Sequence, residues 1–131
     1  MDEVETYNIV EDAGQMLYNI RHRSFYLAKD IISFITSAKY NRIYFSLFDQ
    51  LLRSATSVGA NLTEGVAGSS KNDFLKYNTI ALKSANETKY WLCLIRDTVI
   101  GVDKIIINNL LAETVEVAKI IATIIINSKK Q

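Results

Sequence analysis

Residues 50–74 read QLLRSATSVGANLTEGVAGSSKNDF, and this stretch decides the fold of the chain. Its first part is rich in small side chains, and Gly65 and Gly68 then weaken a helix. We expect Gly68 to take the left-handed conformation that often ends a helix. Ser70 and Asp73 follow at the spacing of a helix N-terminal capping box. The stretch therefore predicts a helix, a tight turn and a second helix.

Polar residues follow one face of each of these two helices. They recur at steps of three and four, which places them on one side of a helix. If the helices fold back antiparallel, Glu64 lies opposite Asp73, and Arg53 lies within reach of Glu87. We predict an Arg53–Glu87 contact inside a structural polar seam between the helices. The residues assigned to this seam are Gln50, Arg53, Asn61, Glu64, Asp73, Ser84 and Glu87, with Ser57 on the same face.

An enzyme is the alternative interpretation of the same polar residues. Arg53, Glu64, Asp73 and Glu87 would then have to open into a solvent-accessible pocket. Buried polar seams more commonly specify how helices pack, so we assign no catalytic residues.

The motifs in this region resemble one protein family. QLLRSATSVGANLTEG, then KNDFLKY and ANETKYWL, are similar to the bacterial four-helix bundle proteins of the 23S ribosomal RNA intervening-sequence family. These in turn are similar to the accessory protein of diversity-generating retroelements. The resemblance covers residues 24–129 and rests on Arg53-Ser54, Asn61, Glu64, Asp73-Phe74 and Glu87-Thr88 in that order.

The resemblance implies an all-α, antiparallel up-down four-helix bundle that assembles as a homopentameric ring. It also implies a role associated with nucleic acid, because the retroelement accessory protein is a basic ring that works with a reverse transcriptase. The net charge of this chain is only +1.

Composition limits the remaining classes. A chain of 131 residues with 49% hydrophobic residues suits one domain with a real core, and the absence of proline suits an all-helical fold. A single cysteine, Cys93, fits a reducing cytoplasm and reads as a small hydrophobic residue. With one histidine, His22, and no Walker spacing in GVAGSSK, we expect no metal or cofactor site. No signal peptide or membrane span is expected.

The chain begins with an acidic segment, residues 1–20, which holds five acids and no lysine or arginine. We treat it as an N-terminal extension, either a mobile tail or a short helix that docks in an assembly. Residues 21–131 form the bundle domain. Its first helix is expected from a Ser24 cap to about residue 37, with Phe25, Ala28, Ile31, Ile32 and Ile35 as its apolar stripe.

A basic cluster over residues 21–43 reverses the charge of the N-terminal segment. It is a solvated surface, a phosphate-binding patch, or a partner for the acidic segment. Lys76 and Lys83, seven residues apart, form a second basic row, while Tyr90 and Trp91 read as core or interface anchors or as a base-stacking platform. The candidate nucleic-acid contacts are Arg21, Arg23, Lys29, Lys76 and Lys83.

Three further helices are expected over about 43–67, 71–100 and 104–128, with Gly101 ending the third and Asp103 capping the last. The last helix has two apolar stripes, which predicts a second partner and so an oligomer. One stripe is Ile107, Leu111, Val115, Ala118, Ile121 and Ile125, and the other is Ile106, Leu110, Val117, Ile120 and Ile124.

These observations favour a non-enzymatic, homo-oligomeric ring that binds RNA, DNA or a nucleic-acid enzyme such as a reverse transcriptase. The alternative is a protein-interaction scaffold that binds no nucleic acid, favoured by the near-neutral charge and by an acidic segment that could mask the basic cluster. Removing residues 1–20 would leave 15 basic residues against nine acids, a net charge of +6.

Overall fold

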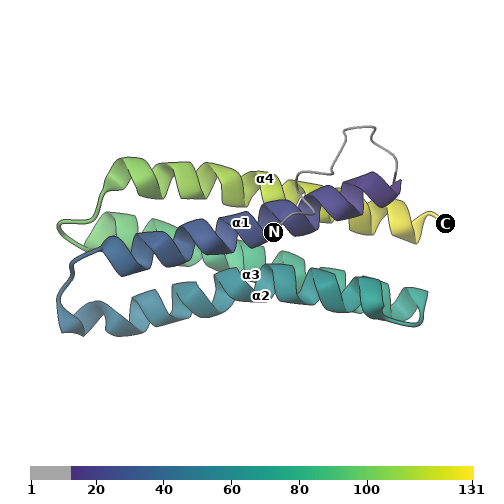
Figure 1. Cartoon of the computed structure of the whole chain (residues 1–131), viewed down its shortest axis with the longest axis horizontal. Helices are drawn as coiled ribbons and strands as arrows, with labels where there is room; N and C mark the ends of the chain where they lie inside the picture. Colours follow the sequence, from purple (N-terminus) through teal and green to yellow (C-terminus); the bar gives the residue numbers. More distant parts are fainter. Residues whose placement is uncertain (1–12) are drawn as a thin grey trace.

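The computed structural model describes residues 13–131, and residues 1–12 lie outside the described part of the chain. Four long helices run alternately up and down, as Figure 1 shows: α1 (Ala13–Ser37), α2 (Phe45–Ala67), α3 (Lys71–Thr98) and α4 (Lys104–Lys129). A short 3₁₀ turn, η2 (Arg42–Tyr44), precedes α2. The predicted all-α four-helix bundle is confirmed.

The order of packing around the bundle places α1 and α3 at opposite corners. The α2–α3 interface is the most extensive, α3 also packs on α4, and α1 packs on α2 and α4. The α1–α2 and α3–α4 connections meet at one end of the bundle, and the α2–α3 turn and the C-terminus lie at the other (Figure 1). Residues on the outer faces of α1 and α3 therefore lie on different sides of the molecule.

Local capping signals fix two of the helix starts. The Ser70 hydroxyl accepts a hydrogen bond from the Asp73 amide at 3.0 Å, and Asp103 accepts from the amides of Ile105 and Ile106, as predicted. The prediction for Gly68 was wrong, because its φ is −64°. The left-handed residue is Gly101, with φ +92°, just beyond the end of α3.

The first helix departs from its prediction in both its start and its buried face. It begins at Ala13, so residues 13–20 are helical, and Ser24 lies buried in mid-helix rather than at a cap. Of the predicted stripe only Ile31 is in the core, while Phe25 and Ile32 are each 44% exposed. The earlier start adds apolar residues in another phase, and the longer stripe is the one that is buried. It consists of Ile20, Leu27, Ile31 and Phe34.

The two apolar stripes of the last helix are also buried in a different way from the one predicted. Both stripes supply residues to one wide core face within a single bundle, so they do not require a second partner. From the second stripe only Ile106 is exposed, at 43%. The buried residues of α4 are Ile107, Leu110, Leu111, Thr114, Val117, Ile121, Ile124 and Ile125.

Candidate nucleic-acid interface

The polar seam between α2 and α3 is built from small side chains. The Ser84 hydroxyl donates to Ser57 Oγ at 2.9 Å, and the Thr88 and Ser54 hydroxyls lie 2.9 Å apart. Asn61 donates from Nδ2 to the carbonyl and hydroxyl oxygens of Ser57. Of the predicted seam residues, Asn61 and Ser84 therefore lie in this network, which Ser54 and Thr88 complete. Ser54 and Thr88 were not assigned to the seam from the sequence. The signal that could have found them is that both are small polar residues at helical spacing from the assigned ones.

The larger polar residues assigned to the seam lie at its rim. Arg53 and Glu87 do not pair as predicted, because each finds a partner one turn away on its own helix. Arg53 Nε donates to Asp49 at 2.8 Å, and Glu87 accepts from the indole N–H of Trp91 at 3.0 Å. Glu64 is exposed, whereas Gln50 and Asp73 are half-buried. The structure does not bring the charged groups of the seam into one pocket.

A groove of about 1080 Å³ separates parts of α1 and α2. Phe25 and Ile32, both predicted for the core, instead lie along this groove. At Gly59 the two helices approach closely, since a Cβ built there would lie at a contact distance of 3.6 Å from Ser24 Cβ. The groove is lined by Tyr18, Arg21, His22, Ser24, Phe25, Ala28, Lys29, Ile32, Thr56, Gly59, Ala60, Thr63 and Glu64.

The basic candidates on α1 have three different environments. Lys29 is exposed with its ammonium 5.6 Å from the centre of the Tyr26 ring. Arg21 is half-buried, and its Nε is buried with no hydrogen-bond partner among the described residues. Arg23 forms a bidentate pair with Glu113 of α4, at 2.6 and 2.9 Å, so its charge is already compensated.

The basic candidates on α3, Lys76 and Lys83, are exposed and continue to an exposed tyrosine. Tyr90 lies seven residues beyond Lys83 and is 59% exposed, so it points outward rather than serving as a core anchor of the single bundle. Asn72, Thr79 and Asn86 are uncharged positions on this face, and Glu87, between Lys83 and Tyr90, accepts a hydrogen bond from the Trp91 indole. We call the row Lys76, Lys83 and Tyr90 the α3 row.

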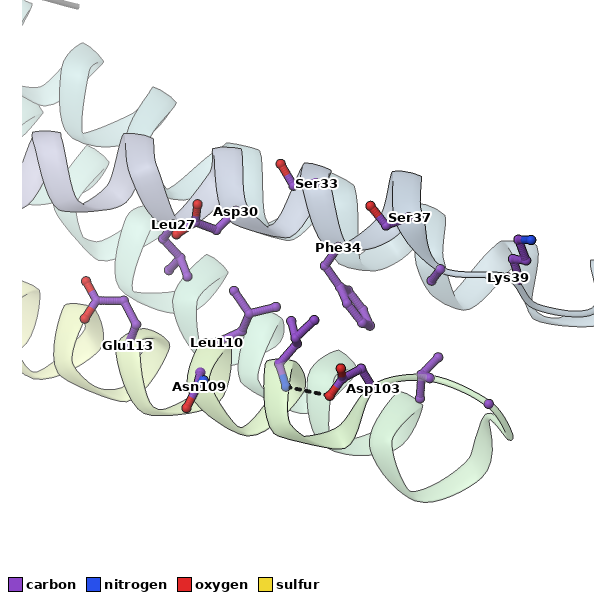
Figure 2. Close-up of a pocket in the computed structure, with 14 residues that line it drawn as sticks. Leu27, Asp30, Ser33, Phe34, Ser37, Lys39, Asp103, Asn109, Leu110 and Glu113 are labelled. Atoms are coloured by element: carbon purple, nitrogen blue, oxygen red, sulfur yellow. Dashed lines mark hydrogen bonds between the residues drawn. The ribbon is translucent and has the colours of Figure 1, made fainter.

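A second groove, of about 690 Å³, lies between the C-terminal half of α1 and the start of α4. Figure 2 shows Asp30, Glu113 and Asp103 around it, with Lys39 at its far end. Three carboxylates against one lysine make this groove a poor match for phosphate.

The α1–α2 and α3–α4 connections meet at one end of the bundle (Figure 1). Large apolar side chains in and beside these connections are exposed. We call these residues the isoleucine end. They are Ile43 (77% exposed), Phe45 (56%), Ile100 (90%) and Ile105 (75%). Exposed apolar side chains that gather at one end of a molecule are typical of surfaces that contact protein.

The displaced pKa values belong to surface ion pairs. A hydrogen bond to Glu113 raises the pKa of Arg23, and hydrogen bonds to Asp49 and Asp97 raise the pKa of Arg53 and Arg96. The hydrogen bond from Arg96 lowers the pKa of Asp97. Each shift favours the charged form of a paired group and so does not prepare an acid or base for proton transfer.

Within residues 13–131 no group of three or more metal-ligating side chains comes together. In the same range no helix is both long and apolar enough to cross a membrane. Cys93 is a free thiol that is partly buried against the core, and Trp91 is also partly buried against it.

The fold and motifs agree with comparisons to known proteins. The chain is similar to a solved protein of unknown function from the S23 ribosomal protein family of Bacteroides thetaiotaomicron VPI-5482, with 31% identity and a TM-score of 0.77. That similarity covers 84% of this chain and 97% of the other. No curated protein matches the chain. The model of the 23S rRNA-intervening sequence protein family matches residues 17–123. The chain therefore belongs to the 23S rRNA-intervening sequence protein family.

Proposed function

We propose that this protein is a non-enzymatic, ring-forming accessory protein that binds RNA or DNA through the α3 row. The observation that carries the proposal is the alignment of Lys76, Lys83 and Tyr90 on one exposed face of α3. Membership in a family associated with a ribosomal RNA insertion supports it.

The chemistry of the α3 row suits an unpaired strand. Lys76 and Lys83 stand two helical turns apart, about 10 Å, so they can neutralise different phosphates of one backbone. Tyr90 offers an aromatic ring edge-on to Trp91, at 5.0 Å between ring centres, on which a base can stack. This combination of a basic track and an aromatic platform is typical of sequence-tolerant binding to single strands.

In a homopentameric ring the α3 row occurs five times, so a site that is weak in one chain can bind nucleic acid with higher overall affinity. One bundle presents two row lysines, which is a small phosphate contact. Several rows on one ring engage a single nucleic acid at once and raise the overall affinity through effective concentration. A reverse transcriptase or another nucleic-acid enzyme is the protein partner that fits this accessory role.

The test is fluorescence anisotropy with labelled single-stranded RNA, structured RNA and duplex DNA, from about 50 to 200 mM salt. The Lys76→Glu/Lys83→Glu variant is expected to lose at least tenfold in affinity and about two units of salt slope per engaged row. Tyr90→Ala is expected to weaken binding to single strands by about 1–3 kcal/mol, whereas Tyr90→Phe keeps the stacking ring.

A matched control separates the row from net charge. Lys39→Glu/Lys129→Glu makes the same charge change at two exposed lysines outside α3. Equal loss in both double variants would mean that binding follows overall charge, and unchanged binding in the α3 variant would exclude the row.

A protein-interaction scaffold is the second candidate, and the isoleucine end favours it. Ile100 and Ile105 are 90% and 75% exposed, so this end of the bundle is suited to contact with protein. An intact oligomer that binds no nucleic acid at the lowest salt would leave this as the better function.

A further inference from the structure

Two polar atoms of residues along the α1–α2 groove are buried without a hydrogen-bond partner within the described residues. Ser24 is 1% exposed and its hydroxyl makes no hydrogen bond there, and Arg21 Nε is also buried without a partner. Buried donors are normally satisfied, because losing water without gaining a partner is costly. Both atoms have almost no exposed surface, so the character of an occupant follows from the exposed charges and apolar side chains of the groove.

The groove also sets the charge and polarity of its occupant. Arg21 and Lys29 are cations on its α1 side, and His22 lies between them, against one acid, Glu64, on α2. Phe25 and Ile32 add exposed apolar surface along the same length. The fitting occupant carries carboxylates interleaved with apolar side chains. A phosphate backbone would satisfy Arg21 but would leave the apolar surface uncovered.

Residues 1–12 of the chain have this composition. They hold five acids and no lysine or arginine. Val4, Tyr7, Ile9 and Val10 lie between the acids, which are Asp2, Glu3, Glu5, Glu11 and Asp12.

The length of the segment suits the groove as well. It directly precedes Ala13, where α1 begins, and the groove runs along α1 from Tyr18 to Ile32. Lys29 lies about 24 Å along α1 from Ala13, since each helical residue advances about 1.5 Å. Twelve extended residues span up to about 40 Å, so Glu3 and Glu5 can reach Lys29.

We propose that the acidic segment of residues 1–12 docks in the α1–α2 groove of its own chain, antiparallel to α1, and covers Arg21 and Lys29. Docking removes both cations from the surface offered to nucleic acid and leaves the α3 row, on the opposite corner of the bundle, exposed. The inference does not depend on the proposed function, because it concerns a contact within one chain.

The test uses the full wild-type chain and zero-length carbodiimide coupling, which joins a carboxylate to a lysine amine that it contacts. Mass spectrometry of the digested protein is expected to show Lys29 joined to Asp2, Glu3 or Glu5, with the product lost at high salt. Lys76 is the internal control, because it is equally exposed but lies on α3. Coupling to Lys76 as strong as to Lys29, or no coupling to Lys29, would overturn the proposal.

Two further measurements complete the test. The first uses a mixture of isotopically heavy and light chains. Lys29 cross-links in which both peptides carry the same label support docking within one chain. Cross-links between a heavy and a light peptide would mean that the segment of a neighbouring chain occupies the groove. Replacing Phe25 and Ile32 together by serine is expected to reduce the Lys29 product several-fold while leaving every charge in place. A Lys29 product unchanged in this variant would contradict docking in the groove.

Discussion

Two glycines in α2 have opposite requirements although both lie inside the same helix. A Cβ built on Gly65 would lie 3.0 Å from Asn78 Nδ2 and 3.3 Å from Tyr77 Cβ, so these side chains have to shift by a few tenths of an ångström to admit it. At Gly59 the nearest atom would be at an ordinary contact distance of 3.6 Å. Close approach of α2 and α3 therefore depends on Gly65, whereas Gly59 has room for a methyl group.

The corresponding prediction compares the two alanine variants by urea unfolding at one protein concentration. Gly59→Ala is expected to raise the free energy of unfolding by up to about 1 kcal/mol, from helix propensity alone. Gly65→Ala is expected to lower it by about 1–3 kcal/mol, because overpacking at the buried contact outweighs the same propensity gain. An equal stabilisation by both would show that the α2–α3 contact is not close-packed at Gly65.

An ion pair between Arg23 and Glu113 joins α1 to α4. Arg23 and Glu113 are bonded through both carboxylate oxygens, and their side chains are 40% and 37% exposed. At this exposure solvent screening keeps the coupling small, so a double-mutant cycle with alanine is expected to give about 0.5–1 kcal/mol, decreasing with salt. The cycle Arg53→Ala/Asp49→Ala, a more exposed pair within α2, is the control and is expected to give less. A coupling equal in the two cycles would contradict the larger role of the interhelical pair.

The pH dependence of this ion pair follows from the direction of the arginine shift. The hydrogen bond to Glu113 raises the pKa of Arg23 in the folded state. Its contribution is fully present below the pKa of the unfolded arginine and is lost only as the pH rises through the folded value. Titration of Arg23 therefore adds no pH dependence to stability near neutral pH.

The helix boundaries show which parts of the individual helices could be predicted from the sequence. The starts of α3 and α4 followed from Ser70 and Asp103, since a capping side chain acts on amides two or three residues away. The start of α1 was missed because it has no such local signal, and the acidic residues before it suggested a tail. Its buried face depends on the packing of α1 against α2 and α4, which is a tertiary effect that periodicity within residues 24–37 could not reveal.

For the whole molecule, the bundle was predictable and the distribution of the functional residues was not. Absence of proline and four helix-length segments predicted an all-helical chain, and the family resemblance implied the up-down bundle. The five basic candidates, however, divide between α1 and α3, which lie at opposite corners. Only the packing order separates them, and only it shows that Glu113 compensates Arg23. The rim position of Arg53 and Glu87 likewise follows from how closely α2 approaches α3.

The isoleucine end bears on assembly of the whole molecule. A ring is expected to show a mass five times that of one chain by light scattering, as family resemblance implies. If the isoleucine end supplies part of the subunit contact, Ile100→Lys/Ile105→Lys is expected to reduce the mass, because both side chains would take charge into a buried interface. Thr123→Lys/Asn127→Lys is the control, since it adds the same charge at exposed positions of α4 far from that end. A full-sized oligomer in the isoleucine variant would mean that this surface contacts a different protein partner. A monomeric wild-type protein would contradict the ring, and the proposed gain in affinity from several α3 rows would then be lost.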